Sequence, residues 1–155
     1  MALEIERKFL INKAKWDVLE KPNGQLYRQG YLSSNPNMII RIRHTETSGY
    51  LTIKGKLEGA TRPEFEYEIP KYEVIQLLQL FAPSSVIKKR YKIVDHGKIW
   101  EVDEFLEDNL GLFIAEIELN SENEQIEIPE WIEKEVTDDK RYYNSYLSTN
   151  PFTNW

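Results

Sequence analysis

The sequence predicts an α+β fold in which about eight antiparallel strands close into a β-barrel, with a few helices at its periphery. Two observations support this fold class. Apolar and polar residues alternate along much of the 155-residue chain, and turn-forming residues separate several of the alternating segments. A third observation concerns what the barrel contains: the polar faces of these segments carry almost only charged side chains.

Alternation of apolar and polar residues is typical of strands that have one apolar and one polar face. The segments with this pattern are Leu3–Ile11, Gln25–Leu32, Met38–Thr45, Tyr50–Leu57, Arg62–Ile69, Val86–Asp95, Lys98–Leu106 and Leu112–Asn120. Short turns such as Asp95-His96-Gly97 lie between some of them, and turns of this length join antiparallel neighbours. We therefore expect a mainly antiparallel sheet.

Three helices are predicted. Asn12 caps a short one that runs to Leu19, and a third begins near Asp138 or Asp139 and continues through Leu147. Pro70 opens the second helix. Its apolar face carries Val74, Leu77, Leu78 and Phe81. Residues 148–155 have few structural cues, and we expect a loosely held tail.

Composition limits the classes of protein that fit. The chain has the length of a single domain, residues 1–155, and contains no cysteine, which excludes a disulfide scaffold, a zinc–thiolate site and thiol catalysis. Its net charge of −6 argues against non-specific binding to nucleic acid. The first residues are charged from Glu4 onward, and no apolar run has the length of a membrane span. We expect a cytoplasmic protein that binds no membrane.

The charged faces have two interpretations. On a single strand, a charged face is most simply a solvated one, but seven of the predicted strands share the feature. The predicted helices are too few to cover the apolar face of an open sheet of this size, whereas closing the sheet gives one face an interior. Alternation alone leaves open whether the charged or the apolar face lies inside.

The signs of the charges favour a charged interior, because cations and carboxylates largely occupy different strands. The cations are Lys8, Arg41, Arg43, Lys54, Arg62, Lys88 and Arg90. The carboxylates are Glu4, Glu6, Glu64, Glu66, Glu101, Asp103, Glu116 and Glu118. Neighbouring carboxylates on one strand repel each other unless a divalent cation lies between them. Arginine and lysine suit phosphate oxygens, so a phosphate chain with bound metal fits both sets.

These residues resemble a known family. The pentapeptide Glu4-Ile5-Glu6-Arg7-Lys8 is similar to the Glu-x-Glu-x-Lys signature of the CYTH, or triphosphate tunnel metalloenzyme, superfamily. The supporting motifs follow in the family's order and span nearly the whole chain. They are Arg41-Ile42-Arg43, Thr52-Ile53-Lys54-Gly55, Arg62-Pro63-Glu64-Phe65-Glu66, Lys88-Lys89-Arg90-Tyr91, Trp100-Glu101-Val102-Asp103 and Glu116-Ile117-Glu118.

The resemblance implies an eight-stranded tunnel, a substrate that carries a triphosphate, and dependence on Mg²⁺ or Mn²⁺. It assigns the phosphate contacts to Lys8, Arg41, Arg43, Lys54, Arg62, Lys88 and Arg90. It assigns metal binding, directly or through water, to Glu4, Glu6, Glu64, Glu66, Asp103, Glu116 and Glu118; Glu101 matches less specifically. Lys8 is the implied catalytic residue, and the sequence leaves open whether it is a general base or a phosphate clamp.

Inorganic tripolyphosphate, cleaved to pyrophosphate and phosphate, is the expected substrate, because the compact chain offers no clear device for recognising an organic group. The alternatives are a nucleoside or thiamine triphosphatase, an adenylate cyclase acting on ATP, and a non-catalytic polyphosphate or nucleotide sensor.

The segment Asp138–Leu147 resembles the family's C-terminal helix, which either covers the tunnel mouth or packs on the barrel. Tyr27, Gln29 and Tyr31 share a face that either points inward or packs on neighbours. An apolar outer face makes a homodimer plausible.

Overall fold

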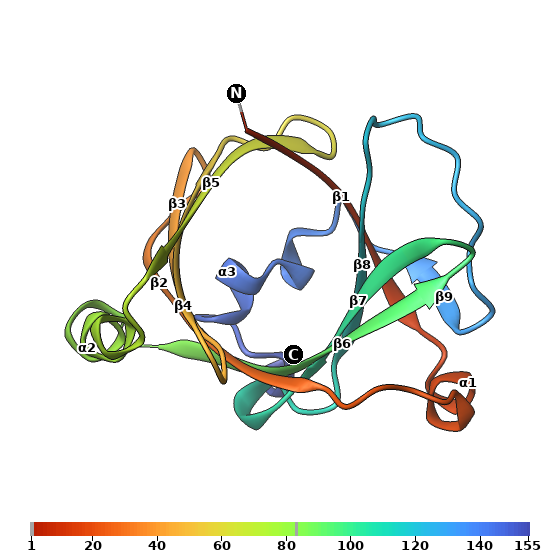
Figure 1. Ribbon diagram of the computed structural model, residues 1–155, viewed down its shortest axis with the longest axis horizontal. Helices are drawn as coiled ribbons and strands as arrows, with labels where there is room; N and C mark the ends of the chain where they lie inside the picture. Colours follow the sequence, from red (N-terminus) through yellow and green to blue (C-terminus); the bar gives the residue numbers. More distant parts are fainter. Residues whose placement is uncertain (1, 83) are drawn as a thin grey trace.

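The computed structural model describes residues 2–82 and 84–155. Within them the chain forms a strand-rich ring with short helices around it (Figure 1). The strands are β1 Leu3–Ile11, β2 Gln25–Asn35, β3 Met38–His44, β4 Gly49–Gly55, β5 Thr61–Ile69, β6 Ser85–Asp95, β7 Lys98–Phe105, β8 Phe113–Glu118 and β9 Ile132–Glu135. The α-helices are α1 Lys13–Val18, α2 Lys71–Phe81 and α3 Asn144–Leu147, and 3₁₀ turns cover Glu107–Asn109 (η1), Lys140–Tyr142 (η2) and Phe152–Asn154 (η3).

The sheet closes on itself. Its strand order is β5-β4-β3-β2-β6-β7-β8-β1-β9, and an additional antiparallel pairing joins β5 to β1. In that pairing Leu3 lies opposite Pro63 and Ile5 lies opposite Thr61. Strands β1 to β8 therefore form the closed antiparallel barrel that the sequence predicts, and Figure 1 looks along its axis.

Strand β9 was not predicted. It pairs with the second half of β1, where Phe9 lies opposite Glu135 and Ile11 lies opposite Ile132. The edge of β1 is thus shared, because β5 occupies its first residues and β9 its last ones. A four-residue segment with one buried apolar side chain is too short to show a period of two, so its pattern carries no strand signal.

The apolar faces of the strands point away from the tunnel and pack in clusters outside it. Phe9, Trp16, Trp100 and Trp131 form an aromatic cluster between the barrel wall and α1 and β9, with ring centroids 5.5 to 5.8 Å apart. Aromatic rings in edge-to-face contact contribute beyond their buried area. The question that alternation left open is therefore answered: the charged face lines the interior.

Two of the predicted helices form. The side chain of Asn12 caps α1 by accepting a hydrogen bond from the backbone N–H of Lys15 (3.1 Å). Helix α2 packs on the outer wall, where Val74 and Leu78 bury against Ile42. Phe81 is a correction to the predicted apolar face, because 59% of it is exposed. It is the last residue of the helix.

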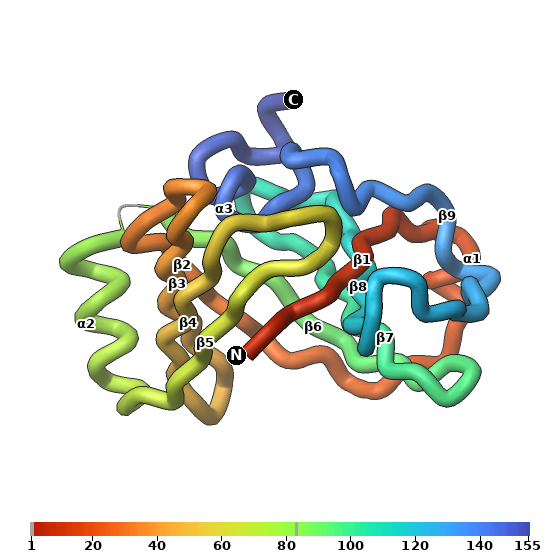
Figure 2. Tube along the Cα trace, turned by 90° about the horizontal axis from the view of Figure 1, so that it is seen from above, coloured from red at the N-terminus to blue at the C-terminus, as the bar shows by residue number. Residues whose placement is uncertain are grey.

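The third predicted helix is wrong in its extent. The segment divides into η2 and α3, and Tyr143 between them is extended, with φ −74° and ψ 135°. Asp139 caps η2 by accepting the N–H of Arg141 (3.1 Å). Figure 2 shows this C-terminal segment crossing one end of the barrel, and Figure 1 shows α3 over the centre of the ring. The break at Tyr143 turns the chain across the barrel mouth.

The last residues also make defined contacts. The N–H of Phe152 donates to Asn109 (2.8 Å), and Thr153 donates to the carbonyl of Asp108 (2.7 Å). Trp155 packs against Phe152 and Tyr142 with ring centroids 5.0 and 5.4 Å away. These contacts hold the C-terminus against the loop that follows β7.

In the described part of the chain, no helix combines the length and the apolarity needed to cross a membrane.

Candidate functional site

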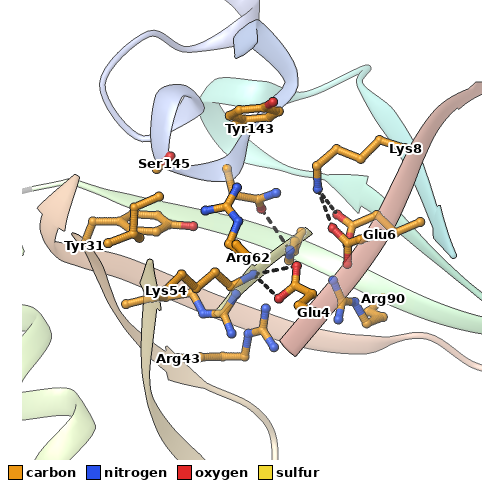
Figure 3. Close-up of a pocket in the computed structure, with 15 residues that line it drawn as sticks. Glu4, Glu6, Lys8, Tyr31, Arg43, Lys54, Arg62, Arg90, Tyr143 and Ser145 are labelled. Carbon is orange, nitrogen blue, oxygen red and sulfur yellow. Dashed lines mark hydrogen bonds and ion pairs between the residues drawn. The ribbon is translucent and has the colours of Figure 1, made fainter. Parts of the chain in front are cut away.

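The barrel encloses a cavity at the end that the C-terminal segment covers (Figure 3). All seven cations of the predicted phosphate set line it: Lys8, Arg41, Arg43, Lys54, Arg62, Lys88 and Arg90. Tyr31 from β2, Ile39 from β3, and Tyr143, Asn144 and Ser145 from the C-terminal segment complete the lining, together with Glu4, Glu6 and Glu116. The structure therefore brings together cations that the sequence spreads over five strands.

A second cavity continues from the first toward the opposite end of the barrel. It shares Glu4, Arg41, Arg43, Arg90 and Glu116 with the first, so the two form one tunnel. Its other carboxylates are Glu64, Glu66, Glu101 and Glu118. Cations thus concentrate at the covered end and carboxylates at the opposite end. A tunnel polarised in this way attracts a polyanion to one end and a metal cation to the other.

Two lysines lie between pairs of carboxylates. The ammonium of Lys8 contacts Glu6 (2.8 Å) and Glu116 (3.1 Å), because strand pairing sets Lys8 directly opposite Glu116. Burial lowers the pKa of Lys8, but the carboxylates of Glu116 and Glu6 outweigh burial and raise the pKa above its ordinary value. Lys8 is therefore a fixed positive charge in this arrangement. Lys54 lies in the same way between Glu4 (2.8 Å) and Glu64 (3.3 Å).

The carboxylates near Lys8 are crowded. Burial, followed by the neighbouring carboxylate of Glu116, raises the pKa of Glu6 to about 7. Burial also raises the pKa of Glu4 and of Glu118, and the charges of Glu4 and Glu6 add to the effect on Glu118. Carboxylates that resist ionisation beside one another are stabilised by a divalent cation placed between them.

The chemistry of this donor set suits a hard divalent cation, which prefers carboxylate oxygens. Among residues 2–82 and 84–155, no three such ligands converge on one point, because the carboxylates turn toward lysine and arginine instead. Glu4, Glu6, Glu64, Glu116 and Glu118 nevertheless share one side of the tunnel through the pairing of β8, β1 and β5.

Asp103 has a different environment from the other predicted metal ligands. Its side chain is 0% exposed, and it accepts hydrogen bonds from Arg90 Nε (2.7 Å) and Arg90 Nη2 (2.9 Å). The Lys88 ammonium lies 2.7 Å from the same carboxylate, and the Lys88 side chain is 1% exposed. Glu66 is similarly engaged, since it accepts from Thr52 (2.8 Å) and Arg41 (3.1 Å).

Two arginines of the tunnel form no ion pair with a carboxylate among the described residues. Arg43 donates from Nε to the side-chain carbonyl of Gln29 (3.0 Å), and its guanidinium lies 5.1 Å from the ring centroid of Tyr27. Burial, followed by the charges of Arg41 and Arg90, lowers the pKa of Arg43 to about 10. Arg62 likewise lines the cavity without an ion-pair partner in the resolved ranges. Cations that repel one another in a shared cavity bind an anion favourably.

Charge patterning did not mark several residues that shape the tunnel. Gln29 and Thr52 are 0% exposed inside the barrel. Asn144 accepts a hydrogen bond from the Lys88 ammonium (2.9 Å), and Tyr143 donates from its hydroxyl to the carbonyl of Thr137 (3.2 Å). The sequence left open whether the strand face with Tyr27, Gln29 and Tyr31 points into the tunnel or packs on neighbouring residues. The structure supports the first interpretation, because Tyr31 lines the first cavity and Tyr27 lines the second.

Comparisons with known proteins agree with this arrangement. The CYTH domain family matches residues 2–148. An inorganic triphosphatase of Acetivibrio thermocellus is 47% identical over 156 residues, which cover 100% of this chain and 99% of that protein. An inorganic triphosphatase of Nitrosomonas europaea is 35% identical over 94% of this chain and 96% of its own length. The solved structure of the inorganic triphosphatase NE1496 aligns with a TM-score of 0.65 and 30% identity, over 94% of this chain and 97% of that one. The family model matches nearly the whole chain, and two relatives are 47% and 35% identical to it over 94% or more of its length. This protein therefore belongs to the CYTH domain family.

Proposed function

We propose that this protein is a metal-dependent triphosphatase that cleaves inorganic tripolyphosphate to pyrophosphate and phosphate inside the tunnel. The observation that carries the proposal is the group of buried and half-buried cations at the covered end, of which Arg43 and Arg62 lack a carboxylate partner in the described part of the chain. The relatives named inorganic triphosphatase, at 47% and 35% identity, support the same activity.

The cations fit the demands of phosphoryl transfer. Hydrolysis adds water to a terminal phosphorus and breaks its bond to the bridging oxygen, so negative charge grows on the leaving pyrophosphate. Arginine presents paired N–H donors to phosphate oxygens, while lysine presents a compact charge. Because the protein holds these groups in place before the substrate arrives, they stabilise the developing charge without reorganising.

We propose that Glu4, Glu6, Glu64, Glu116 and Glu118 hold Mg²⁺ or Mn²⁺ on the acidic side of the tunnel. Dependence on a divalent metal is general among CYTH triphosphatases. When bound, the metal supplies charge neutralisation for phosphate oxygens and lowers the pKa of water. Asp103 differs because it is 0% exposed and both of its oxygens accept from Arg90. Glu66 differs because it accepts from an arginine and a hydroxyl, Arg41 and Thr52, rather than from a lysine. We assign these two carboxylates to positioning the phosphate-binding cations.

Organic triphosphates are the second candidate class. Because Tyr143, Asn144 and Ser145 cover the cationic end, a nucleoside or thiamine group would have to lie toward the acidic end. Tyr27 and Tyr50 line that end, but the Tyr27 ring already contacts the guanidiniums of Arg43 and Arg90 at 5.1 and 5.2 Å. Unsubstituted tripolyphosphate avoids placing an organic group among carboxylates, which favours it over ATP as substrate.

Phosphate release from a panel of substrates tests the proposal. Tripolyphosphate, ATP, GTP, thiamine triphosphate and pyrophosphate are each supplied with Mg²⁺ or Mn²⁺, and cleavage of tripolyphosphate is expected to be far faster than that of the others. Excess EDTA should stop it, because the developing charge then lacks a metal ion. Activity that survives EDTA, or a preference for ATP with cyclic AMP as product, would contradict the proposal; tight binding without turnover would indicate a sensor.

Metal affinity should depend on pH near neutrality. Glu6 has a pKa raised to about 7, so it is mostly protonated at pH 6 and mostly ionised at pH 8. A carboxylate must lose its proton to bind a metal, so affinity increases as the pH rises through this range. We expect the half-saturating Mg²⁺ concentration to be roughly tenfold higher at pH 6 than at pH 8.

Glu6→Gln tests the assignment of that pH dependence. The variant should require more Mg²⁺ at both pH values, and the difference between them should become smaller. Glu20→Gln is the control, because Glu20 is exposed beyond the end of α1. An unchanged pH dependence in Glu6→Gln would show that another group is responsible.

A further inference from the structure

Gln29 is a buried, uncharged side chain at the centre of the cationic wall. It lies on β2 and is 0% exposed. Its carbonyl oxygen accepts from Arg43 Nε (3.0 Å), and its amide nitrogen donates to Tyr31 Oη (2.9 Å) and to Asn144 Oδ1 (3.2 Å). Asn144 Oδ1 also accepts from Lys88 Nζ (2.9 Å). We call Gln29 and Asn144 the amide pair.

The orientation of the amide pair is fixed by two cations. A guanidinium and an ammonium only donate hydrogen bonds. The carbonyl of Gln29 must therefore face Arg43, which leaves its NH₂ group facing Asn144. Because the NH₂ group of Gln29 faces Asn144, it is the carbonyl oxygen of Asn144 that accepts from it, and the same oxygen accepts from Lys88. Each amide has one arrangement that satisfies its neighbours.

The amide pair joins the two halves of the cationic wall. Arg43 on β3 contacts Gln29, Gln29 contacts Asn144, and Asn144 contacts Lys88 on β6. Lys88 in turn shares the carboxylate of Asp103 with Arg90. Three phosphate-binding cations thus belong to one continuous network, and one of its links comes from the C-terminal segment rather than from the barrel.

The C-terminal segment is itself anchored, so Asn144 is a firm link. Leu147 is buried among Val86, Phe105 and Ile114, and the hydroxyl of Tyr143 donates to the carbonyl of Thr137. Because Asn144 lies between these two anchors, its side chain has a defined place above Lys88. Figure 3 shows the segment crossing directly over the cationic residues.

We propose that Gln29 is a positioning residue that orients Arg43 and, through Asn144, Lys88 for binding the substrate phosphates. The inference rests on the proposed function, since it concerns how the tunnel grips tripolyphosphate. Uncharged amides supply the acceptors that these buried cations need, yet they add no negative charge that would repel the phosphates. A carboxylate in either place would satisfy the cations and weaken the anion site.

Gln29→Met tests the proposal, because methionine nearly preserves volume while it removes both hydrogen-bonding groups. We expect the KM for tripolyphosphate to rise about tenfold, with kcat changed less than about threefold, because the lost interactions orient ground-state phosphate contacts. Asn144→Ala should behave similarly. Since the two residues act as one unit, the double variant should lose little more than either single variant.

Two further variants separate positioning from folding. Gln29→Glu keeps the acceptor for Arg43 but adds a negative charge to the cationic wall and presents an acceptor to Asn144 Oδ1, so we expect a KM at least as high as in Gln29→Met. Asn150→Ala is the control, because the exposed Asn150 side chain donates to the carbonyl of Tyr146 (3.3 Å) and to Thr149 (3.1 Å), neither of which lines the tunnel. A merely structural defect would lower the amount of active enzyme, and hence the apparent kcat, while leaving KM unchanged.

Calorimetric binding of tripolyphosphate without metal gives a readout independent of turnover, with a Kd about tenfold weaker expected for Gln29→Met. Wild-type KM and Kd in Gln29→Met, or fully additive effects in the double variant, would overturn the inference while leaving the triphosphatase proposal intact. If the unmodified protein cleaves no tripolyphosphate but binds it, the proposed function fails and the Kd comparison still decides the role of Gln29. If it neither binds nor cleaves it, both proposals fail.

Discussion

Replacing Lys8 by alanine should lower kcat/KM for tripolyphosphate by about 10²- to 10³-fold, which is the usual effect of removing one fixed charge-stabilising group from an active site. The Lys8 ammonium lies in the cationic cavity, 2.8 Å from Glu6 and 3.1 Å from Glu116. In the variant the two carboxylates face the phosphates without the cation between them, so repulsion adds to the lost attraction. Steady-state kinetics at saturating Mg²⁺ measures the effect.

Lys8→Arg decides between the two roles that the sequence left open for this residue. The neighbouring carboxylates raise the pKa of Lys8, so it is protonated near neutral pH and suited to clamping phosphate rather than removing a proton. Arginine keeps the positive charge but does not give up its proton. A clamp therefore predicts that Lys8→Arg retains much more activity than Lys8→Ala, for example about a tenth of the wild-type rate.

The control for both variants is Lys15→Ala, an exposed lysine of α1 outside the barrel. It should match the wild type in activity. Circular dichroism should be unchanged in all three variants. Equal and nearly complete inactivation by arginine and alanine at position 8 would instead support a general base. Near-normal rates in Lys8→Ala would remove Lys8 from the mechanism.

The sequence predicts the strands and the contents of the barrel because both depend on local pattern. A period of two follows from the geometry of each strand alone, so alternation marks β1 to β8 without knowledge of their neighbours. The near-exclusive use of charged residues on one face then identifies the tunnel wall. This is why all seven cations expected to contact phosphate line one cavity.

The contacts between these side chains depend on strand register, which local pattern does not contain. Lys8 meets Glu116 across 108 positions of sequence, because β1 and β8 pair at that residue. The pairing of β6 with β7 sets Arg90 opposite Asp103, so this carboxylate, which the sequence marks as a possible metal ligand, contacts two cations. A pattern read one strand at a time identifies which residues face inward, but not which of them neutralise each other.

The sequence left the places of the uncharged tunnel residues open for a related reason. Gln29 and Asn144 are 115 positions apart, and neither carries the charge that marks the other wall residues. Asn144 also lies in the segment where the expected helix is interrupted at Tyr143. The extended backbone there reflects the anchoring of the segment on the barrel, a tertiary effect that overrides the local helical preference.

Removing the Asp103 carboxylate should destabilise the barrel strongly. It is fully buried and accepts from Arg90 at 2.7 and 2.9 Å, with the Lys88 ammonium 2.7 Å away. Removing one partner of a buried ion pair leaves charges without compensation, which costs about 3–5 kcal/mol. We therefore expect Asp103→Ala to lower the free energy of unfolding by about that amount, measured by urea denaturation at pH 7.

The expected size of the effect depends on burial, and an exposed pair provides the comparison. Asp17 pairs with Lys13 on α1, where both side chains are more than half exposed (54% and 56%). Asp17→Ala should cost no more than about 1 kcal/mol. Similar losses in Asp17→Ala and Asp103→Ala would mean that the Asp103 network contributes little.

The pH dependence of unfolding provides a second test of Asp103. Burial alone would raise its pKa, but Arg90 and Lys88 outweigh burial and hold the pKa below the ordinary value of 3.8. A carboxylate with a depressed pKa in the folded state contributes stability that is complete above its unfolded pKa and is lost as the pH falls through its folded pKa. The difference in stability between the wild type and Asp103→Asn should therefore be full at pH 7 and diminish only below about pH 4. If the difference in stability between the wild type and Asp103→Asn disappears between pH 5 and 7, Asp103 titrates near neutrality. The carboxylate would then be a candidate metal ligand rather than the fixed counter-charge of Arg90 and Lys88.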